Sequence, residues 1–83
     1  MRILIVEDEK KVSGFIKKGL EEETYAVDVA VDGEEGLLFG EQNQYDLIIL
    51  DLMLPKIDGL EVLSTLRDRK IETPILLLTA KDS

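Results

Sequence analysis

Apolar residues form four short runs along the chain, separated by longer stretches in which they recur at helical spacing. The runs over residues 3–6, 46–51 and 74–79 are apolar through most of their length, which is typical of parallel strands buried on both faces. Residues 25–30 instead alternate between apolar and other positions and carry a charge at Asp28. This period of two indicates a strand at a sheet edge, where a charge discourages pairing with another chain.

The stretch over residues 9–22 predicts an amphipathic helix. Its apolar and small residues recur three and four positions apart, which places them on one helical face. This face holds Val12, Phe15, Ile16, Gly19 and Leu20. Charged residues, mostly lysines, occupy the opposite face, so we expect the apolar face to pack on the sheet and Phe15 to be a packing residue.

Two further helices each begin with a capping box. Asp32 and Asp58 are the expected N-caps, and Glu35 and Glu61 follow three residues later, as a reciprocal cap requires. The first of these helices is predicted to end near residue 41, and its two glycines give it weak intrinsic propensity. The second is predicted to end near residue 70 and to turn three leucines inward, namely Leu60, Leu63 and Leu66.

The order of elements is therefore β-α-β-α-β-α-β within a single domain. Strands that alternate with helices predict an α/β fold, in which a parallel sheet has right-handed crossovers and helices on both faces. Element boundaries are predicted to within a few residues only.

Composition narrows the classes of function. Of the 83 residues, 45% are hydrophobic, as in globular domains, and the chain has neither cysteine nor histidine. Disulfides, thiolate metal sites and Ser-His or Cys-His catalysis are therefore excluded. A net charge of −8 argues against direct nucleic-acid binding, which needs clustered lysines and arginines. No apolar run is long enough for a membrane span and no signal sequence opens the chain, so we expect a cytoplasmic protein.

Oxygen-bearing side chains gather where the predicted strands end. Glu7 and Asp8 follow the first strand, Asp51 ends the third, and Thr79 ends the fourth. Ligands of open parallel sheets collect at the carboxyl ends of the strands. If the first and third strands are neighbours, three carboxylates meet there, and their mutual repulsion calls for a cation. An oxygen-only set selects Mg²⁺ or Mn²⁺ and suits phosphoryl transfer to a carboxylate nucleophile.

Less specific interpretations of the same residues remain open. Glu7 and Asp8 are also the kind of residue that begins a helix, because acidic side chains favour the first turn. Thr79 is also an ordinary strand residue, since threonine is common in strands. Asp51 is also acceptable as a solvated strand end.

Four motifs in order make the chain similar to response-regulator receiver domains, and especially to those of the winged-helix transcriptional class. They are ILIVEDE at 3–9, DLIILDLMLP at 46–55, DG at 58–59 and LLTAK at 77–81. Each is weak alone, but together they match the family's spacing over the whole chain. The resemblance implies a flavodoxin-like receiver sheet with strand order 2-1-3-4-5.

The resemblance also implies a role for each site residue. Asp51 would accept a phosphoryl group from the histidine of a sensor kinase. Asp8 would bind Mg²⁺ directly, Glu7 would complete the acidic pocket, in part through water, and the backbone carbonyl of Met53 would be a further ligand. Thr79 would turn toward the phosphoryl group and report its presence. The protein would be a signalling switch and not a classed enzyme, and it would normally control transcription through an output domain.

Residues 1–83 depart from the family in one respect. The family has a fifth strand that ends in a lysine paired with the phosphoryl group, together with its fourth and fifth helices, and none of these has a counterpart here. We therefore expect residues 1–83 to be the N-terminal part of a receiver domain, without any DNA-binding domain. The strand over 74–79 then becomes an exposed apolar edge, which predicts self-association through this edge or by exchange of elements.

Three functions from different classes follow. The first is the phosphorylatable switch. The second is a receiver fragment that is not phosphorylated and acts only as a folding or self-assembly module, because the family's lysine is missing. The third is a metal-dependent phosphohydrolase or NTPase. No Gly-x-x-x-x-Gly-Lys-Ser/Thr loop exists to cradle a nucleotide phosphate, which argues against the third.

Overall fold

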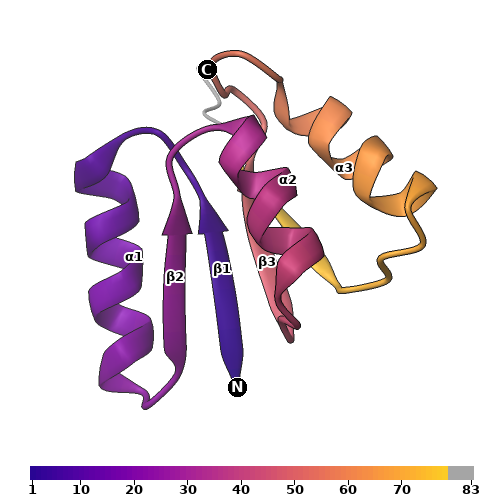
Figure 1. Cartoon of the computed structure of the whole chain (residues 1–83). Coiled ribbons are helices and arrows are strands. Elements are labelled where there is room, and N and C mark those ends of the chain that lie inside the picture. The colour runs from indigo at the N-terminus through magenta and orange to yellow at the C-terminus, as the bar shows by residue number, and fades with distance from the viewer. Residues whose placement is uncertain (79–83) are drawn as a thin grey trace.

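The computed structural model describes residues 1–78 and contains the predicted alternation of strands and helices (Figure 1). The elements are β1 (Arg2–Val6), α1 (Lys10–Glu22), β2 (Ala26–Ala30), α2 (Gly33–Gln42), β3 (Leu47–Asp51), α3 (Gly59–Asp68) and β4 (Ile75–Leu78). The predicted α/β class is confirmed, and the predicted boundaries hold to within one or two residues. Among these helices, none is long and apolar enough to cross a membrane.

All four strands run parallel in one sheet with the order β2-β1-β3-β4. In the centre Ile5 of β1 is paired with Val29 of β2 on one side and with Ile49 of β3 on the other. Figure 1 shows the arrows of β2 and β1 pointing to the same edge of the sheet, and β3 runs parallel to β1. This order confirms that β2 is an edge strand. It also confirms that β1 and β3 are neighbours, so the residues that follow them meet at one edge.

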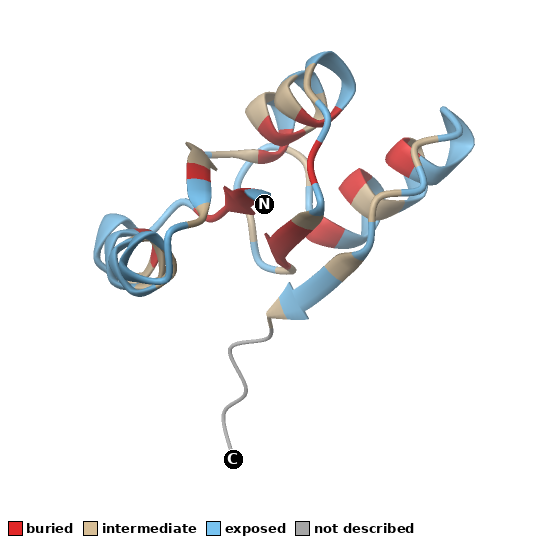
Figure 2. Ribbon diagram, turned by 90° about the horizontal axis from the view of Figure 1, so that it is seen from below, coloured by how far each residue is buried: buried red, intermediate tan, exposed pale blue. Residues whose placement is uncertain are grey.

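Helices cover both faces of the sheet, as predicted. One core cluster joins the sheet to α1 through Ile16 and Leu20. The other joins it to α2 and α3 through fully buried residues such as Val62 and Leu66. In the view of Figure 2, β1 and β3 lie between these two layers and are largely buried. The apolar runs of β1 and β3 are therefore explained by burial on both sides.

Two residues predicted to face the core do not. Leu60 is 59% exposed, and the buried face of α3 is formed instead by Gly59, Val62 and Leu66. Leu60 lies two positions from Val62, about 200° around the helix, so it cannot share that face. Phe15 is 81% exposed, because α1 packs on the β1–β2 half of the sheet and contacts it through the neighbouring Ile16.

In both predicted capping boxes, the side chain of the N-cap residue accepts the expected backbone hydrogen bond. The backbone N–H of Glu35 donates to Asp32 Oδ1 over 2.8 Å, and that of Glu61 donates to Asp58 Oδ1 over 2.9 Å. Glu35 reciprocates one position earlier than expected, since its Oε1 accepts from the backbone N–H of Val31 over 3.0 Å. Glycine lets α2 approach β1 closely, because a Cβ at Gly36 would lie 2.8 Å from a Val6 methyl carbon.

A polar network at the amino end of the sheet was not predicted. Tyr45 is buried, and its hydroxyl donates to Asp28 Oδ2 over 2.7 Å. The same oxygen accepts from the guanidinium of Arg2 over 2.8 Å, and this guanidinium also lies over the Tyr45 ring. Asp28 is thus more than a charge on an edge strand, because it links β2 to β1 and to the segment before β3.

Candidate metal and phosphoryl site

Three carboxylates converge at the carboxyl ends of β1 and β3. Glu7 and Asp8 directly follow β1, and Asp51 is the last residue of β3. Val6 and Leu50 are register partners, which brings the two strand ends side by side. One carboxylate oxygen of each residue lies within 4.8 Å of the others. The convergence predicted from the sequence is confirmed, and the alternative in which Glu7 and Asp8 only begin a helix is wrong for Glu7, which lies before α1 and is buried.

Backbone contacts hold Glu7 in place. Its backbone N–H donates to the carbonyl of Ala30 over 3.0 Å, which extends the β1–β2 pairing by one bond. Its Oε2 accepts from the backbone N–H of Glu9 over 2.9 Å. Glu7 as a whole is only 5% exposed. Its side chain is therefore held in a fixed position and is not solvated.

Asp51 is also buried, with its Oδ1 accepting from the backbone N–H of Met53 over 3.0 Å. The first turn of α3 lies directly against its backbone. A Cβ on Gly59 would lie 2.3 Å from the Asp51 carbonyl oxygen and 2.6 Å from Leu52 Cα. Only glycine fits this contact. Glycine at position 59 therefore allows the start of α3 to pack directly against the end of β3.

The cluster is electrostatically unbalanced. Burial raises the pKa of Glu7 above its ordinary value of 4.5, the Glu9 N–H acts against this rise, and the charges of Asp51 and Asp8 add to it. Within residues 1–78 no lysine or arginine forms an ion pair with any of the three carboxylates. A bound cation would offset this repulsion. The donor set contains only oxygen, which fits Mg²⁺.

The carboxylates line a cavity of about 630 Å³ between α1 and the sheet. Its acidic end is formed by Glu7, Asp8 and Asp51 and its apolar end by α1 and β4, with these lining side chains: Val12, Phe15, Ile16 and Leu78. The exposed Phe15 therefore lies at the rim of this cavity. Asp8 is exposed where Glu7 and Asp51 are buried, so the site is open to a ligand on one side.

The remaining predicted site residues are placed only in part. Met53 contacts the site through its backbone N–H, and a role for its carbonyl stays a prediction. Thr79 lies outside the described residues. Lys56, in the loop after β3, pairs through its Nζ with Asp32 and Glu34 at 3.3 Å each.

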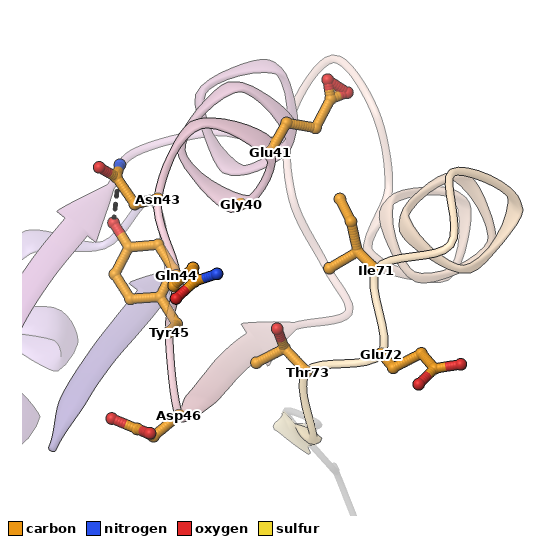
Figure 3. A pocket seen from close by; sticks show the side chains of 9 residues that line it. All are labelled: Gly40, Glu41, Asn43, Gln44, Tyr45, Asp46, Ile71, Glu72 and Thr73. Carbon is orange, nitrogen blue, oxygen red and sulfur yellow. Dashed lines mark hydrogen bonds between the residues drawn. The ribbon is translucent and has the colours of Figure 1, made fainter.

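A second cavity of about 540 Å³ lies at the opposite end of the sheet (Figure 3). It is bounded by the end of α2 and by the segments that precede β3 and β4. Figure 3 shows Asn43 bonded to Tyr45 on one side of it and Ile71 and Thr73 on the other. It lies at the amino ends of the strands, away from the three carboxylates, and its tyrosine belongs to the structural network with Asp28.

Comparison with known proteins identifies the family. The family model described as "Response regulator receiver domain" matches residues 3–83. The chain belongs to the receiver domain family. It is 51% identical over 82 residues to the transcriptional regulatory protein PcoR of Escherichia coli, an alignment that covers 99% of this chain and 36% of PcoR. The chain thus spans about a third of the length of PcoR.

Solved receiver domains share the fold. The Francisella response regulator 1452 receiver domain superposes with a TM-score of 0.93 at 41% identity, covering 99% of this chain and 68% of that one. The response regulator TrrA of Thermotoga maritima, solved in complex with Mg²⁺-BeF, has a TM-score of 0.91 at 44% identity and coverage of 98% and 70%. These values confirm the flavodoxin-like receiver arrangement expected from the sequence motifs.

Proposed function

We propose that this receiver domain accepts a phosphoryl group on Asp51 from the phosphohistidine of a sensor histidine kinase, in a reaction that depends on Mg²⁺. The observation that carries the proposal is the convergence of Glu7, Asp8 and Asp51 within 4.8 Å, without an ion-pair partner among the described residues. The Mg²⁺-BeF complex of TrrA supports it, because that relative binds the same class of ion.

The hydrogen bonding of Asp51 suits attack on phosphorus. Its Oδ1 is engaged by the Met53 N–H, and within residues 1–78 no hydrogen bond engages Oδ2. This oxygen is the nucleophile. As its bond to phosphorus forms, the P–N bond of the donor breaks and the imidazole leaves with the electron pair, taking up a proton. The product is an acyl phosphate on Asp51 and a neutral histidine on the kinase.

Four groups of this chain would hold the ion: the carboxylates of Glu7, Asp8 and Asp51 and the carbonyl of Met53. When bound, Mg²⁺ would offset the negative charge of the phosphoryl oxygens. The buried Glu7 keeps its position through the Glu9 N–H, so it orients the acidic pocket in advance. Thr79 is proposed to donate a hydrogen bond to a phosphoryl oxygen.

The role is that of a signal receiver and not of a classed enzyme. PcoR is named as a transcriptional regulatory protein, and we propose control of transcription as the eventual output. A second candidate function is a folding or self-assembly module without phosphotransfer. The exposure of Leu76 and Leu77 within residues 1–78 favours it. Phosphoryl uptake by Asp51 separates the two functions.

The test is incubation of the chain with acetyl phosphate or phosphoramidate and Mg²⁺, followed by intact mass spectrometry. We expect the addition of one phosphoryl group, which is absent in EDTA and in Asp51→Asn. The control Glu72→Gln changes the net charge equally at an exposed loop, and it should be modified like the parent. No uptake by the folded parent, or uptake that persists in Asp51→Asn, would show that the proposal is wrong.

A further inference from the structure

The loop between β3 and α3, residues 52–58, contains a strained turn at Lys56. The backbone N–H of Ile57 donates to the carbonyl of Pro55 over 2.8 Å, and the φ angle of Lys56 between them is 69°. A hydrogen bond closed across one residue with positive φ is a γ-turn of the rare, strained kind. A lysine is disfavoured there because its Cβ crowds the backbone. Such a turn persists only where neighbouring contacts hold it.

The side chain of Lys56 joins this turn to the start of α2. Its Nζ lies 3.3 Å from Asp32 Oδ2 and 3.3 Å from Glu34 Oε1. Asp32 is the N-cap of α2, and its other oxygen accepts from the Glu35 N–H. One carboxylate therefore caps the helix and pairs with the loop at the same time. Figure 1 shows α2 and α3 beginning at the same edge of the sheet, with this loop leading into α3.

A backbone contact reinforces the ion pairs. Gly33 is the first residue of α2, and a Cβ there would lie 2.5 Å from the carbonyl oxygen of Ile57. The Ile57 side chain packs against the core cluster under α2 and α3. The far side of the turn is thus fixed by packing. The position of Lys56 itself depends on its two acidic partners.

The other end of the loop borders the three carboxylates. Met53 donates its N–H to Asp51 Oδ1 over 3.0 Å. The Gly59 N–H donates to the carbonyl of Leu52 over 3.1 Å, which closes the loop at its base. Only two residues separate Met53 from Lys56, and one of them is a proline, whose φ is fixed. A shift of the turn is therefore passed on to the Met53 carbonyl.

We propose that Lys56 is a positioning residue for Mg²⁺: by holding the loop against α2, it keeps the Met53 carbonyl beside the carboxylate cluster. This inference rests on the proposed function, in which that carbonyl is a metal ligand. Lys56 acts through the loop and is not a ligand itself, because an ammonium group has no lone pair to offer a metal ion.

Charge and position act in opposite directions on the ion. Lys56 is a cation on the loop that borders an acidic site, so removing its charge would by Coulomb attraction alone strengthen Mg²⁺ binding. Loss of the ion pairs instead lets the loop leave its binding shape, which weakens the apparent affinity in proportion to the fraction that remains competent. The direction of the change therefore separates a positioning role from a simple charge effect.

NMR titration of the 83-residue chain with MgCl₂ measures the affinity through the amide signals of Asp8 and Met53. Exposed ion pairs are weak, so we expect Lys56→Gln to raise the dissociation constant about three- to tenfold. Lys56→Arg keeps the charge and should stay within about twofold of the parent. The matched control is Lys70→Gln, because Lys70 also has a positive φ, 65°, and follows the far end of α3. It should bind Mg²⁺ like the parent.

A double-mutant cycle tests the partner. Asp32→Asn keeps an oxygen for the Glu35 N–H and loses the charge that faces Lys56. Its effect and that of Lys56→Gln should add to less than their sum, because either change alone already breaks the pair.

Hydrogen exchange in EDTA measures the shape of the loop without the ion. The amides of Ile57 and Gly59 donate within the loop, and we expect both to exchange about three- to tenfold faster in Lys56→Gln. Lys70→Gln should leave their exchange unchanged. Urea unfolding and circular dichroism establish that each variant is folded.

Mg²⁺ binding by Lys56→Gln that equals or exceeds that of the parent would overturn the inference. Equal weakening by Lys70→Gln, or unchanged exchange of the Ile57 and Gly59 amides, would also overturn it. In each of these cases the parent still binds Mg²⁺, so the proposed function stands. A parent without any response to Mg²⁺ would instead overturn the proposed function together with this inference, so the two failures are distinguishable.

Discussion

Asp51→Asn should make the metal-free protein more stable. Asp51 faces Glu7 and Asp8 across distances of at most 4.8 Å. Two unit charges at that separation repel by about 1 kcal/mol in a water-like medium and by about 3.5 kcal/mol at an effective dielectric constant of 20. The repulsion between Asp51 and Glu7 should be close to the upper value, because both side chains are buried. The repulsion between Asp51 and the exposed Asp8 should be close to the lower value. Asparagine keeps an oxygen for the Met53 N–H and removes the charge.

The net gain should be about 1–3 kcal/mol, because the unfolded chain feels little of this repulsion and the parent relieves part of it by protonation. For a domain of this size, each kcal/mol raises the melting temperature by about 4–8 °C. Burial raises the pKa of Glu7. Its uptake of a proton therefore favours the folded state, so the parent gains stability as the pH falls from neutral toward 4.5. The advantage of Asp51→Asn should shrink over the same range.

Urea and thermal unfolding in EDTA, at low ionic strength and pH 7.5, measure this difference. Repeating both with Mg²⁺ should reverse the ranking, because an ion that binds only the folded parent stabilises it by about 2.7 kcal/mol at a hundredfold excess over its dissociation constant. Glu72→Gln should match the parent in both conditions. The reasoning is refuted if Asp51→Asn is no more stable than the parent in EDTA, or if Mg²⁺ stabilises both proteins equally.

Urea unfolding of three variants tests contacts that stabilise the fold. Tyr45→Phe should lower the free energy of unfolding by about 1–2 kcal/mol at pH 7. Since burial and Asp28 raise the pKa of Tyr45 to about 12, this loss should persist below pH 10 and fade as the pH rises toward 12; an unchanged loss at pH ~11.5 would count against the bond. Gly59→Ala should cost about 2–4 kcal/mol through its contact with the Asp51 carbonyl and should impair phosphoryl uptake in the mass assay. Asp58→Ala should cost about 1 kcal/mol through loss of the N-cap and leave that uptake intact once the protein is folded.

Signals that lie close together in the sequence predicted the structure well. The capping boxes at Asp32 and Asp58 depend on residues three apart, and both are formed. The carboxylate cluster was also predicted, because parallel strands place their carboxyl ends at one edge and the sequence motifs resemble a family in which β1 and β3 are neighbours. The sequence did not specify which face of each helix is turned toward the sheet. The predictions that Leu60 and Phe15 face the core were therefore wrong.

Contacts between segments that are distant in the sequence were harder to predict. Tyr45 stands in a loop between α2 and β3, and its partner Asp28 lies 17 residues earlier on β2. No local pattern relates the two, since their contact exists only once β1 has been inserted between β2 and β3. The exposure of Leu76 within residues 1–78 has the same cause, because the strand order, which is not a local pattern, places β4 outermost among the four described strands.

The strand order also determines how this domain can fold. The closest register partners in its three strand pairs are 24, 44 and 27 residues apart in the chain, so no hairpin is available to start the sheet. Such long loop closures slow folding. The central β1 cannot complete its pairing before β3, which comes later in the chain, has formed. The carboxylates of Glu7 and Asp51 come together only when β1 has paired with β3. We therefore expect Mg²⁺ to slow unfolding while leaving the folding rate nearly unchanged, as is general for contacts absent from the transition state; stopped-flow measurements of both limbs with and without the ion would detect this asymmetry.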